Sequence, residues 1–402
     1  MPLSPTSRRQ GARPRIAVVG GSLGGLTTAL LLRDLGCEVD VYERSAARLS
    51  GFGAGIVVHE ATMRYFKERA KTSLVGISVA AGFLRFVDAS GRVTLEEPCP
   101  YEFTAWSTLY RSLLDLFGQD RYQRGCELIG FDQHEAGVEL RFADGRVEHC
   151  ELLVCADGIL STARSLLCPE AQPQYAGYVG WRGTIEEKRL SAQSAALLAD
   201  SITYGVIDRS HILSYPIPSI DGSTDPGERL INFVWYRNVD ENGELGELMT
   251  DRDGRPRQIS IHPGEVQERH VAELRDVAAA QLPAAFAEMI SLAEPFVQVI
   301  VDLTTPSMVF GRVCLLGDAA FAARPHAAAG TAKAAENAWK LAHALSRNDG
   351  VEQALHDWEP AQLELGRRLV ERSRDIGTRY QVLSNAAPED PELRFGLYRP
   401  GK

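Results

Sequence analysis

The sequence predicts an α/β fold: a parallel, nucleotide-binding sheet interrupted by a mostly antiparallel sheet and followed by C-terminal helices. Three observations lead to this prediction. Residues 15–45 read as a strand, a glycine-rich turn, a helix and a second strand. Residues 175–237 contain four short apolar strands, at 175–181, 202–207, 211–215 and 230–236. Long helices are expected at 330–346 and 351–374.

The glycine-rich turn gives the strongest signal for a Rossmann-type domain. Gly20 permits the tight turn out of the first strand, and Gly25 permits close packing of the helix on that strand. Ser22 stands where the middle glycine is usual, and its hydroxyl can donate to a phosphate at the helix N-terminus. Glu43, followed by Arg44, ends the second strand, where a carboxylate would hold ribose hydroxyls.

Two later motifs also place polar residues at the ends of buried strands. Asp157-Gly158 follows an apolar strand and precedes a helix that contains Arg164. Gly317-Asp318 follows the strand expected at 312–316, and the next helix begins near Gly330. Because most of the β-rich segment lies between these two motifs, the nucleotide-binding domain is predicted to be discontinuous.

The remaining segments complete the expected organisation. A hairpin is expected at 138–153, helices at 109–117 and 264–291, and a strand at 297–302. The polar segment 240–258 is expected to be an exposed loop, and the tail after Ala386 to be extended.

Composition excludes several classes of function. The net charge of −10 argues against nucleic-acid binding and against a polybasic membrane anchor. The sequence has no apolar run of about 18 residues, so no membrane span is expected. Seven cysteines without a CxxC pair indicate buried thiols in a reducing cytoplasm, and the nine histidines show no metal-binding spacing. Oligomeric state is not readable, and a homo-oligomer stays open.

Together, the three motifs resemble the group A flavoprotein monooxygenases, the single-component aromatic hydroxylases of the p-hydroxybenzoate hydroxylase type. The resemblance extends from about residue 15 to 375. The Gly20-Gly-Ser turn, Tyr175–Gly183, Tyr215–Pro218 and Pro325–Gly330 place the chain nearest the branch similar to 2,6-dihydroxypyridine 3-hydroxylase. Phe321, Ala332 and Lys333 depart from the common family pattern.

The resemblance implies non-covalent FAD, transient use of NADH or NADPH, and O2. In the family, the first turn holds the ADP part of FAD, an arginine in the helix near 110 contacts FAD, and the Gly-Asp motif binds the ribityl chain. The Asp-Gly motif serves both FAD and the nicotinamide nucleotide. The cofactor residues implied here are Gly20, Ser22, Gly25, Glu43, Arg44, Arg111, Asp157, Arg164, Gly317, Asp318 and Gly330.

The implied domain organisation has a disordered arm at 1–14 and a C-terminal tail at 376–402. The FAD-binding domain comprises 15–75, 101–173 and 296–375, and the substrate domain comprises 76–100 and 174–295.

The implied reaction is hydroxylation of an electron-rich aromatic ring, in which oxygen adds to the reduced flavin to give a C4a-hydroperoxide that attacks the ring. A hydroxypyridine is the expected substrate, in catabolism or in natural-product tailoring. The alternatives are a phenol or another N-heteroarene as substrate, a FAD-dependent dehydrogenase or oxidase, or a non-catalytic FAD-binding protein.

The expected catalytic residues are His326, Asp302 and Tyr215. His326 lies in a loop of small residues and is a candidate base, a hydrogen-bond donor to a ring oxygen, or a loop-stabilising imidazole. Asp302 ends a buried strand and could orient a base or a substrate N–H, or cap a turn. Tyr215 is a candidate pocket residue or a core tyrosine.

Four further residues are candidates for the substrate pocket. Trp181 and Arg182 could contact substrate or serve packing between domains. Tyr236 could be a wall of an aromatic pocket or a core residue. His211 begins a strand and is expected to be exposed.

Overall fold

The computed structural model describes residues 14–47, 49, 54–70 and 76–402. The expected arm at 1–14, except Pro14, therefore lies outside the described residues, as do Gly51, Phe52 and Gly53. Within the described residues, no helix is both long and apolar enough to cross a membrane.

A six-stranded sheet carries the glycine-rich turn. Its order is β19-β20-β12-β1-β2-β8, and all neighbours are parallel except the β19–β20 pair. The apolar run in β1 is buried because helices cover this sheet, as expected for a parallel sheet. The strands are β1 Arg15–Val19, β2 Glu38–Glu43, β8 Tyr122–Arg124, β12 Leu152–Cys155, β19 Val309–Phe310 and β20 Val313–Leu315.

An eight-stranded sheet forms the second part of the molecule. Its order is β17-β18-β13-β16-β15-β14-β5-β6, and only the β14–β5 pair is parallel. The sheet includes β18, which the expected boundary at 296 assigned to the FAD-binding domain. The strands are β5 Phe83–Val87, β6 Val93–Pro98, β13 Gln174–Glu186, β14 Ser201–Ile207, β15 Ser210–Ile217, β16 Leu230–Asn238, β17 Ser260–Ile261 and β18 Phe296–Asp302.

Two three-stranded sheets complete the β-structure. One contains the predicted hairpin, β10 Gly137–Phe142 and β11 Val147–Cys150, together with β9 Leu128–His134. The other contains β3 Gly55–Val57, β7 Glu102–Ala105 and β4 Val79–Ala80.

The helices differ from the expectation in three places. The segment 264–291 forms two helices, because Pro283 cannot donate the hydrogen bond that would continue the first. The polar segment 240–258 contains a short helix, and the last helix extends to Gln381. The helices are α1 Leu23–Asp34, α2 Glu60–Tyr65, α3 Trp106–Phe117, α4 Thr162–Leu167, α5 Ala192–Leu198, α6 Glu244–Leu248, α7 Glu268–Gln281, α8 Ala284–Leu292, α9 Gly330–Arg347 and α10 Val351–Gln381.

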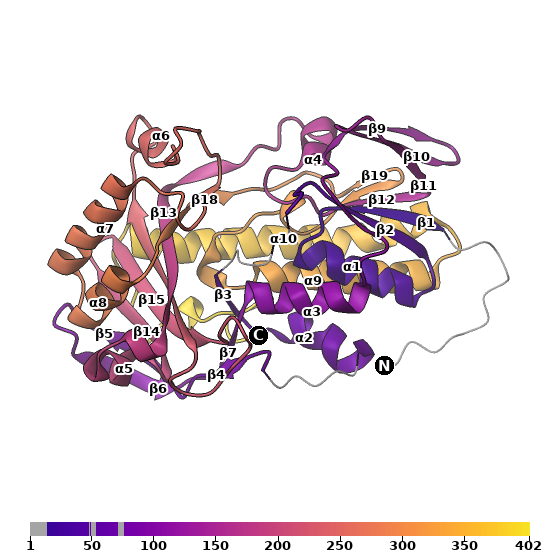
Figure 1. Cartoon of the computed structure of the whole chain (residues 1–402). Helices are drawn as coiled ribbons and strands as arrows, with labels where there is room; N and C mark the ends of the chain where they lie inside the picture. Colours follow the sequence, from indigo (N-terminus) through magenta and orange to yellow (C-terminus); the bar gives the residue numbers. More distant parts are fainter. Residues whose placement is uncertain (1–13, 48, 50–53, 71–75) are drawn as a thin grey trace.

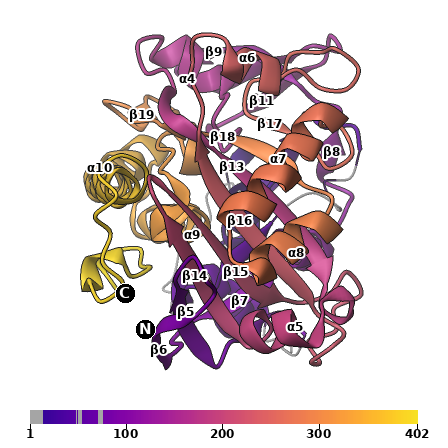
Figure 2. The ribbon, with the colours of Figure 1, turned by 90° about the vertical axis from the view of Figure 1, so that its left-hand side faces the viewer.

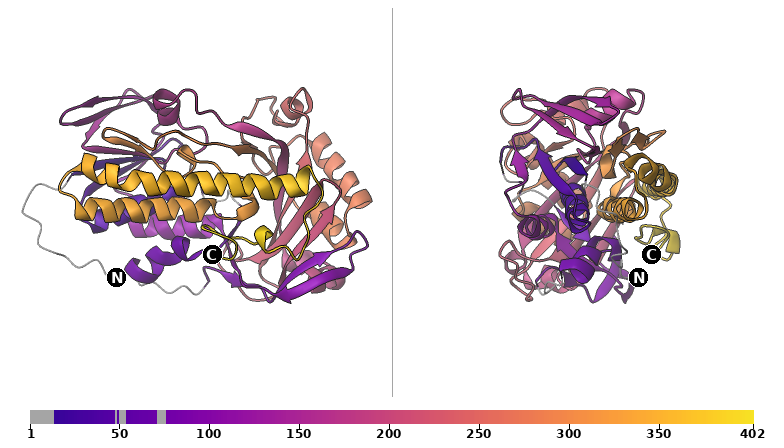
Figure 3. Two further views of the ribbon diagram at one scale, coloured as in Figure 1. Left: turned by 180° about the vertical axis from the view of Figure 1, so that it is seen from behind. Right: turned by 90° about the vertical axis from the view of Figure 1, so that its right-hand side faces the viewer.

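The two large sheets lie at opposite ends of an elongated molecule (Figure 1). The helices α7 and α8 cover the outer face of the eight-stranded sheet (Figure 2), and its inner face points toward the six-stranded sheet. The helices α9 and α10 lie side by side, and α10 runs along the molecule from the six-stranded sheet to the eight-stranded sheet (Figure 3). This arrangement confirms the predicted α/β fold with an inserted, mostly antiparallel sheet.

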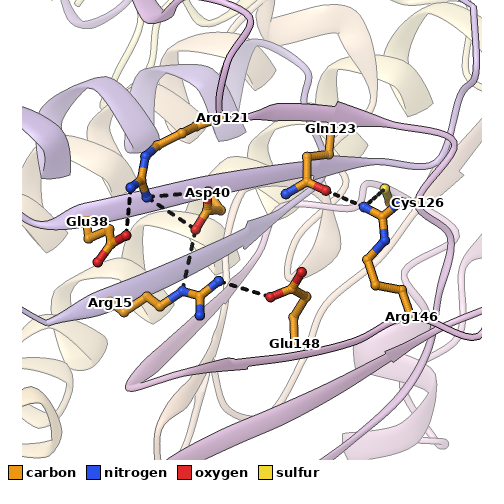
Figure 4. Close-up of polar contacts among 8 residues, drawn as sticks. All are labelled: Arg15, Glu38, Asp40, Arg121, Gln123, Cys126, Arg146 and Glu148. Carbon is orange, nitrogen blue, oxygen red and sulfur yellow. Dashed lines mark hydrogen bonds and ion pairs between the residues drawn. The ribbon is translucent and has the colours of Figure 1, made fainter.

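An ion-pair network connects the strands at one end of the six-stranded sheet (Figure 4). Arg15 on β1 contacts Asp40 at 3.5 Å and Glu148 at 3.0 Å, and Arg121 contacts Asp40 at 3.4 Å and Glu38 at 2.6 Å. The Arg15 and Arg121 side chains are 41% and 47% exposed, and ion pairs with such exposed partners typically contribute about 0–1 kcal/mol each.

Candidate active site

A cavity of about 870 Å³ lies between the two large sheets. At one end it is lined by the turn after β1, and at the other by the inner face of the eight-stranded sheet. The expected residues that line it are Gly20, Ser22, Glu43, Arg44, Asp157, Arg182, His211, Tyr215, Tyr236, Gly317, Asp318, His326 and Gly330.

The glycine-rich turn depends on two positions where a side chain would not fit. Gly20 has a φ of +100°, and a Cβ there would lie 2.2 Å from the carbonyl oxygen of Ala156. A Cβ on Gly25 would lie 1.8 Å from the carbonyl oxygen of Gly20. Bare backbone therefore faces the cavity here, and α1 packs directly on the turn.

Glu43 joins the turn to the end of β2. Its carboxylate accepts hydrogen bonds from the backbone N–H of Gly21 and of Ser45, both at 2.8 Å. Ser22 is the N-cap residue of α1, and within the described residues its side chain makes no capping bond. A hydroxyl and a carboxylate therefore border the cavity beside the N-terminus of α1.

The Asp-Gly and Gly-Asp motifs line the middle of the cavity. Asp157 Oδ1 is buried and has no hydrogen-bond partner within the described residues, and burial raises the pKa of this carboxyl. Beside Asp318, the buried Lys333 Nζ donates to the Gly317 carbonyl oxygen at 3.0 Å, to Asp318 Oδ1 at 3.2 Å and to the Phe321 carbonyl oxygen. Lys333 thus holds the Gly317-Asp318 turn in place through these hydrogen bonds.

These features fit the expected FAD. A bare glycine turn at a helix N-terminus suits a pyrophosphate, and Glu43 suits a ribose. The unpartnered Asp157 Oδ1 and the half-exposed Asp318 supply acceptors for hydroxyl groups further along the cavity.

Asp318→Ala is expected to weaken FAD binding by about tenfold to a hundredfold. A hydrogen bond to a charged group contributes about 1.5–3 kcal/mol, and about 1.4 kcal/mol corresponds to a factor of ten. Titration of the apoprotein with FAD, followed by flavin fluorescence, measures the Kd. Asp357→Ala, a carboxylate of similar exposure on α10, is the control. An unchanged Kd for Asp318→Ala would contradict the assignment.

Three expected cofactor residues, Gly25, Arg111 and Arg164, lie outside the cavity wall. Arg164 is buried, and its guanidinium donates to the carbonyl oxygens of Ile159 at 2.6 Å, Ala171 at 3.0 Å and Ala319 at 3.1 Å. This arginine connects the Asp-Gly and Gly-Asp segments. Arg111 donates to the Ile220 carbonyl oxygen at 2.9 Å. Direct FAD contacts by Arg111 and Arg164 stay predictions.

Strand alternation decides which residues of the eight-stranded sheet reach the cavity, because neighbouring side chains point to opposite faces. On β13, Arg182 lines the cavity, whereas Trp181 packs in the core beneath α7 and α8. On β16, Tyr236 lines the cavity and Trp235 packs in the same core.

A chain of polar contacts supports His326. Its Nε2 lies 2.6 Å from the Tyr178 hydroxyl, and Arg324 Nη1 donates to that hydroxyl at 3.4 Å. Arg324 pairs with Asp302 through Nε at 3.0 Å and Nη2 at 2.7 Å. Asp302 also accepts from Arg374 Nε at 3.0 Å. Asp302 therefore acts on His326 through Arg324 and Tyr178.

Aromatic rings surround His326. The ring centroid of Tyr236 is 4.7 Å away and that of His211 is 5.3 Å away, and His211 stacks on Tyr380 at 3.9 Å. Gln381 Nε2 lies 2.9 Å from His211 Nδ1. His211 is only 1% exposed, so the expectation that it is exposed was wrong, because α10 covers this end of β15.

Burial keeps the histidines and tyrosines of this part of the cavity in their uncharged forms. Burial, assisted by Arg324, lowers the pKa of His326 to about 3. Burial, assisted by His326, lowers the pKa of His211 well below its ordinary value. Burial raises the pKa of Tyr178, and it raises that of Tyr215 to about 12. At neutral pH both histidines are therefore neutral and both tyrosines keep their protons.

Stability is expected to fall on acidification below about pH 6.5. An unfolded histidine binds a proton near pH 6.5, whereas folded His326 binds one near pH 3. Between these values the unfolded state holds more protons, so stability rises with pH, by up to about 1.4 kcal/mol per pH unit for each such histidine. Urea denaturation between pH 5 and 7 measures the slope. His326→Gln should reduce the slope by the share of this one histidine, and the exposed His356→Gln should leave it unchanged. Equal slopes for the two variants would contradict the argument.

Sequence reasoning missed Tyr178, Arg324, Gln298 and Tyr380. Tyr178 lies inside a segment that the resemblance singled out, and Arg324 directly precedes another. Their role follows only from the Tyr178 contact with His326 and the Arg324 contact with Tyr178. Gln298 lines the cavity and accepts from Arg182 Nη1 at 3.0 Å. Tyr380 lies beyond the expected end of the last helix.

The known proteins that are similar to this chain are FAD-binding proteins and monooxygenases, which agrees with the features of the cavity described above. A family described as FAD binding domain matches residues 13–200, and one described as FAD binding domain-like matches 175–302. The 2,6-dihydroxypyridine 3-monooxygenase of Paenarthrobacter nicotinovorans is 38% identical over 384 residues, covering 95% of this chain and 96% of that protein. A 3-amino-4-hydroxybenzoate 2-monooxygenase of Streptomyces platensis is 29% identical, covering 95% and 91%.

Solved structures give the same result. The 2,6-dihydroxypyridine-3-hydroxylase from Arthrobacter nicotinovorans aligns with a TM-score of 0.92 at 37% identity, covering 97% of this chain and 98% of that chain. HpxO of Klebsiella pneumoniae, solved with FAD and uric acid, shares the fold, with a TM-score of 0.76 at 23% identity over 96% and 91%. The chain therefore belongs to the family of FAD-dependent aromatic monooxygenases, which use NAD(P)H and O2.

Proposed function

We propose that this monooxygenase hydroxylates a hydroxypyridine. FAD, when bound, would supply the redox chemistry, in which NAD(P)H is the reductant, one atom of O2 enters the ring and the other leaves as water. The protein must then bind an electron-rich ring, orient its oxygens and exclude water. The relative of 38% identity, which acts on 2,6-dihydroxypyridine by its name, supports this substrate class.

The observation that carries the proposal is the hydrogen-bonded state of His326. The 2.6 Å contact between the Tyr178 hydroxyl and His326 Nε2 can run in either direction, depending on the tautomer of the imidazole. Because Tyr178 accepts from Arg324 and keeps its own proton, we infer that its hydroxyl donates to His326 Nε2. A neutral imidazole that accepts at Nε2 carries its proton on Nδ1. His326 therefore offers an N–H donor for a ring oxygen, and with a pKa of about 3 it is a poor base.

Arg182 supplies the positive charge that a pyridinolate requires. It lines the same cavity, and its buried Nε has no partner within the described residues. Its Nη1 is fixed by Gln298. A ring with two oxygens can thus be held between Arg182 and His326, against the flat surfaces of Tyr236 and Tyr215, which also line the cavity. An anionic ring needs no base in the protein.

Turnover with labelled oxygen tests this function. The protein, loaded with FAD, is mixed with NADH or NADPH under ¹⁸O₂, together with 2,6-dihydroxypyridine, 2-hydroxypyridine or phenol. We expect slow nucleotide oxidation alone, faster oxidation with a hydroxypyridine, and one labelled oxygen in the product. Fast oxidation that is independent of any ring, or a preference for phenol, would overturn the substrate assignment.

Location and assembly are further parts of the proposal. Buried thiols at Cys155 and Cys314 are consistent with a reducing cytoplasm. A homo-oligomer stays a prediction, which sedimentation of the FAD-loaded protein would test.

A further inference from the structure

The segment that follows α10 folds back toward the middle of the molecule (Figure 3). Three apolar side chains recur at every second residue from Leu393, the last residue of a short 3-10 turn at Pro391–Leu393. Leu393, Phe395 and Leu397 are 6%, 6% and 5% exposed. The strip Leu393–Leu397 therefore presents these three side chains to the interior, and Gly396 between the last two is buried as well.

Each buried side chain of this strip contacts a different part of the molecule. Leu393 packs with Ile376 and Tyr380 of α10. Phe395 packs with the inner face of the eight-stranded sheet, and its ring centroid lies 5.0 Å from that of Tyr101. Leu397 packs in a cluster with alanines of the loop that follows His326 and of α9. The strip therefore connects α10, the eight-stranded sheet and the loop that follows His326.

Polar contacts fix the position of the strip. The Gly396 N–H donates at 3.1 Å to the carbonyl oxygen of Ala327, the residue that follows His326. The Phe395 N–H donates to the Tyr101 hydroxyl at 3.2 Å, and Arg394 pairs with Glu97 of β6 at 2.6 Å. Arg372 Nη1 on α10 donates to the Gly396 carbonyl oxygen at 2.8 Å.

Leu393 and Phe395 also line the cavity that contains His326, Tyr236 and Tyr380. We propose that these two side chains limit the size of the substrate. They close the substrate end of the cavity, the part lined by His326, Tyr236 and Tyr380, so that a single ring fits and a fused bicyclic ring does not. The proposal rests on the proposed function for the class of ring. Both residues come from the tail and not from the inserted sheet domain.

Ligand binding without turnover tests the proposal. The FAD-loaded protein is titrated anaerobically with 2-hydroxypyridine and with 2-hydroxyquinoline, which has the same polar edge and one more ring. Perturbation of the flavin absorbance gives the two Kd values. Phe395→Ala should shift the Kd ratio toward the quinoline by about tenfold or more, the scale of discrimination in apolar pockets, and Leu393→Ala should shift it in the same direction. Leu383→Ala, at a site that is 58% exposed, should leave the ratio unchanged.

An unchanged ratio in folded, FAD-loaded Phe395→Ala would overturn the proposal, and so would an equal loss of affinity for both ligands. If Phe395→Ala does not fold, Phe395→Leu must give a smaller shift in the same direction. Phenol and 2-naphthol form a second pair. A shift in the Kd ratio of that pair supports the size limit set by Leu393 and Phe395, even if the wild-type protein hydroxylates no hydroxypyridine. The absence of hydroxypyridine hydroxylation would contradict only the proposed function.

Discussion

His326→Ala is expected to retain FAD and the fold, but to release most of the consumed NAD(P)H equivalents as hydrogen peroxide. The variant removes the N–H that we infer to orient a ring oxygen, and catalysis falls steeply when reacting atoms are misplaced. A loss on the order of a hundredfold in hydroxylation rate is expected. Product and peroxide, measured per nucleotide oxidised, report this uncoupling.

The base hypothesis and the donor hypothesis make opposite predictions for two controls. If His326 were the base, raising the pH would rescue His326→Ala by ionising the substrate, and His326→Gln would be as impaired as alanine. If His326 donates, pH gives no rescue, and glutamine, whose amide can donate, restores part of the coupling. The lowered pKa and the Tyr178 contact favour the second result. Rescue at high pH would contradict the donor role.

Asp302→Ala is expected to lower the free energy of unfolding by about 3–5 kcal/mol, because it leaves a buried charge without its partner. The Asp302 and Arg324 side chains are 7% and 10% exposed, and each is paired with the other. Arg374→Ala should lower the free energy of unfolding by less than about 1 kcal/mol, because the Arg374 side chain is 52% exposed. Urea denaturation of the FAD-loaded proteins measures both values.

Asp302→Asn separates stability from catalysis. It keeps an acceptor for Arg324 but weakens the pair, so it should cost less stability than alanine while still disturbing Tyr178 and His326. An Asp302→Ala protein as stable as wild type would show that Arg324 finds another partner.

The part of the cavity that we assign to FAD could be predicted from the sequence, because its shape depends on backbone conformation. A strand, a glycine turn and a terminal carboxylate impose fixed spacings, and Gly20, Gly25 and Glu43 lie where those spacings required. The connecting role of Arg164 was not predictable, since it donates to carbonyls from segments that are far apart in the sequence.

The part of the cavity around His326 and Tyr236 could be predicted from the sequence only in part. Trp181 and Arg182 are adjacent on one strand, so alternation alone excludes that both face the cavity, and this argument was available from the sequence. The burial of His211 and the Tyr178–His326 contact depend instead on how α10 packs against the inserted sheet, which no local pattern determines.

The long helix α10 contributes to much of the substrate end from a single face. Gly366 lets the Phe321 ring approach, Gly377 lets Tyr178 and His326 approach, and Tyr380 and Gln381 contact His211. Gly366 and Gly377 are eleven residues apart, about three turns at 3.6 residues per turn. Deleting or inserting one residue between them would rotate everything downstream by about 100° and turn this face away from the cavity. Over evolution, therefore, α10 can change its residues more readily than its length.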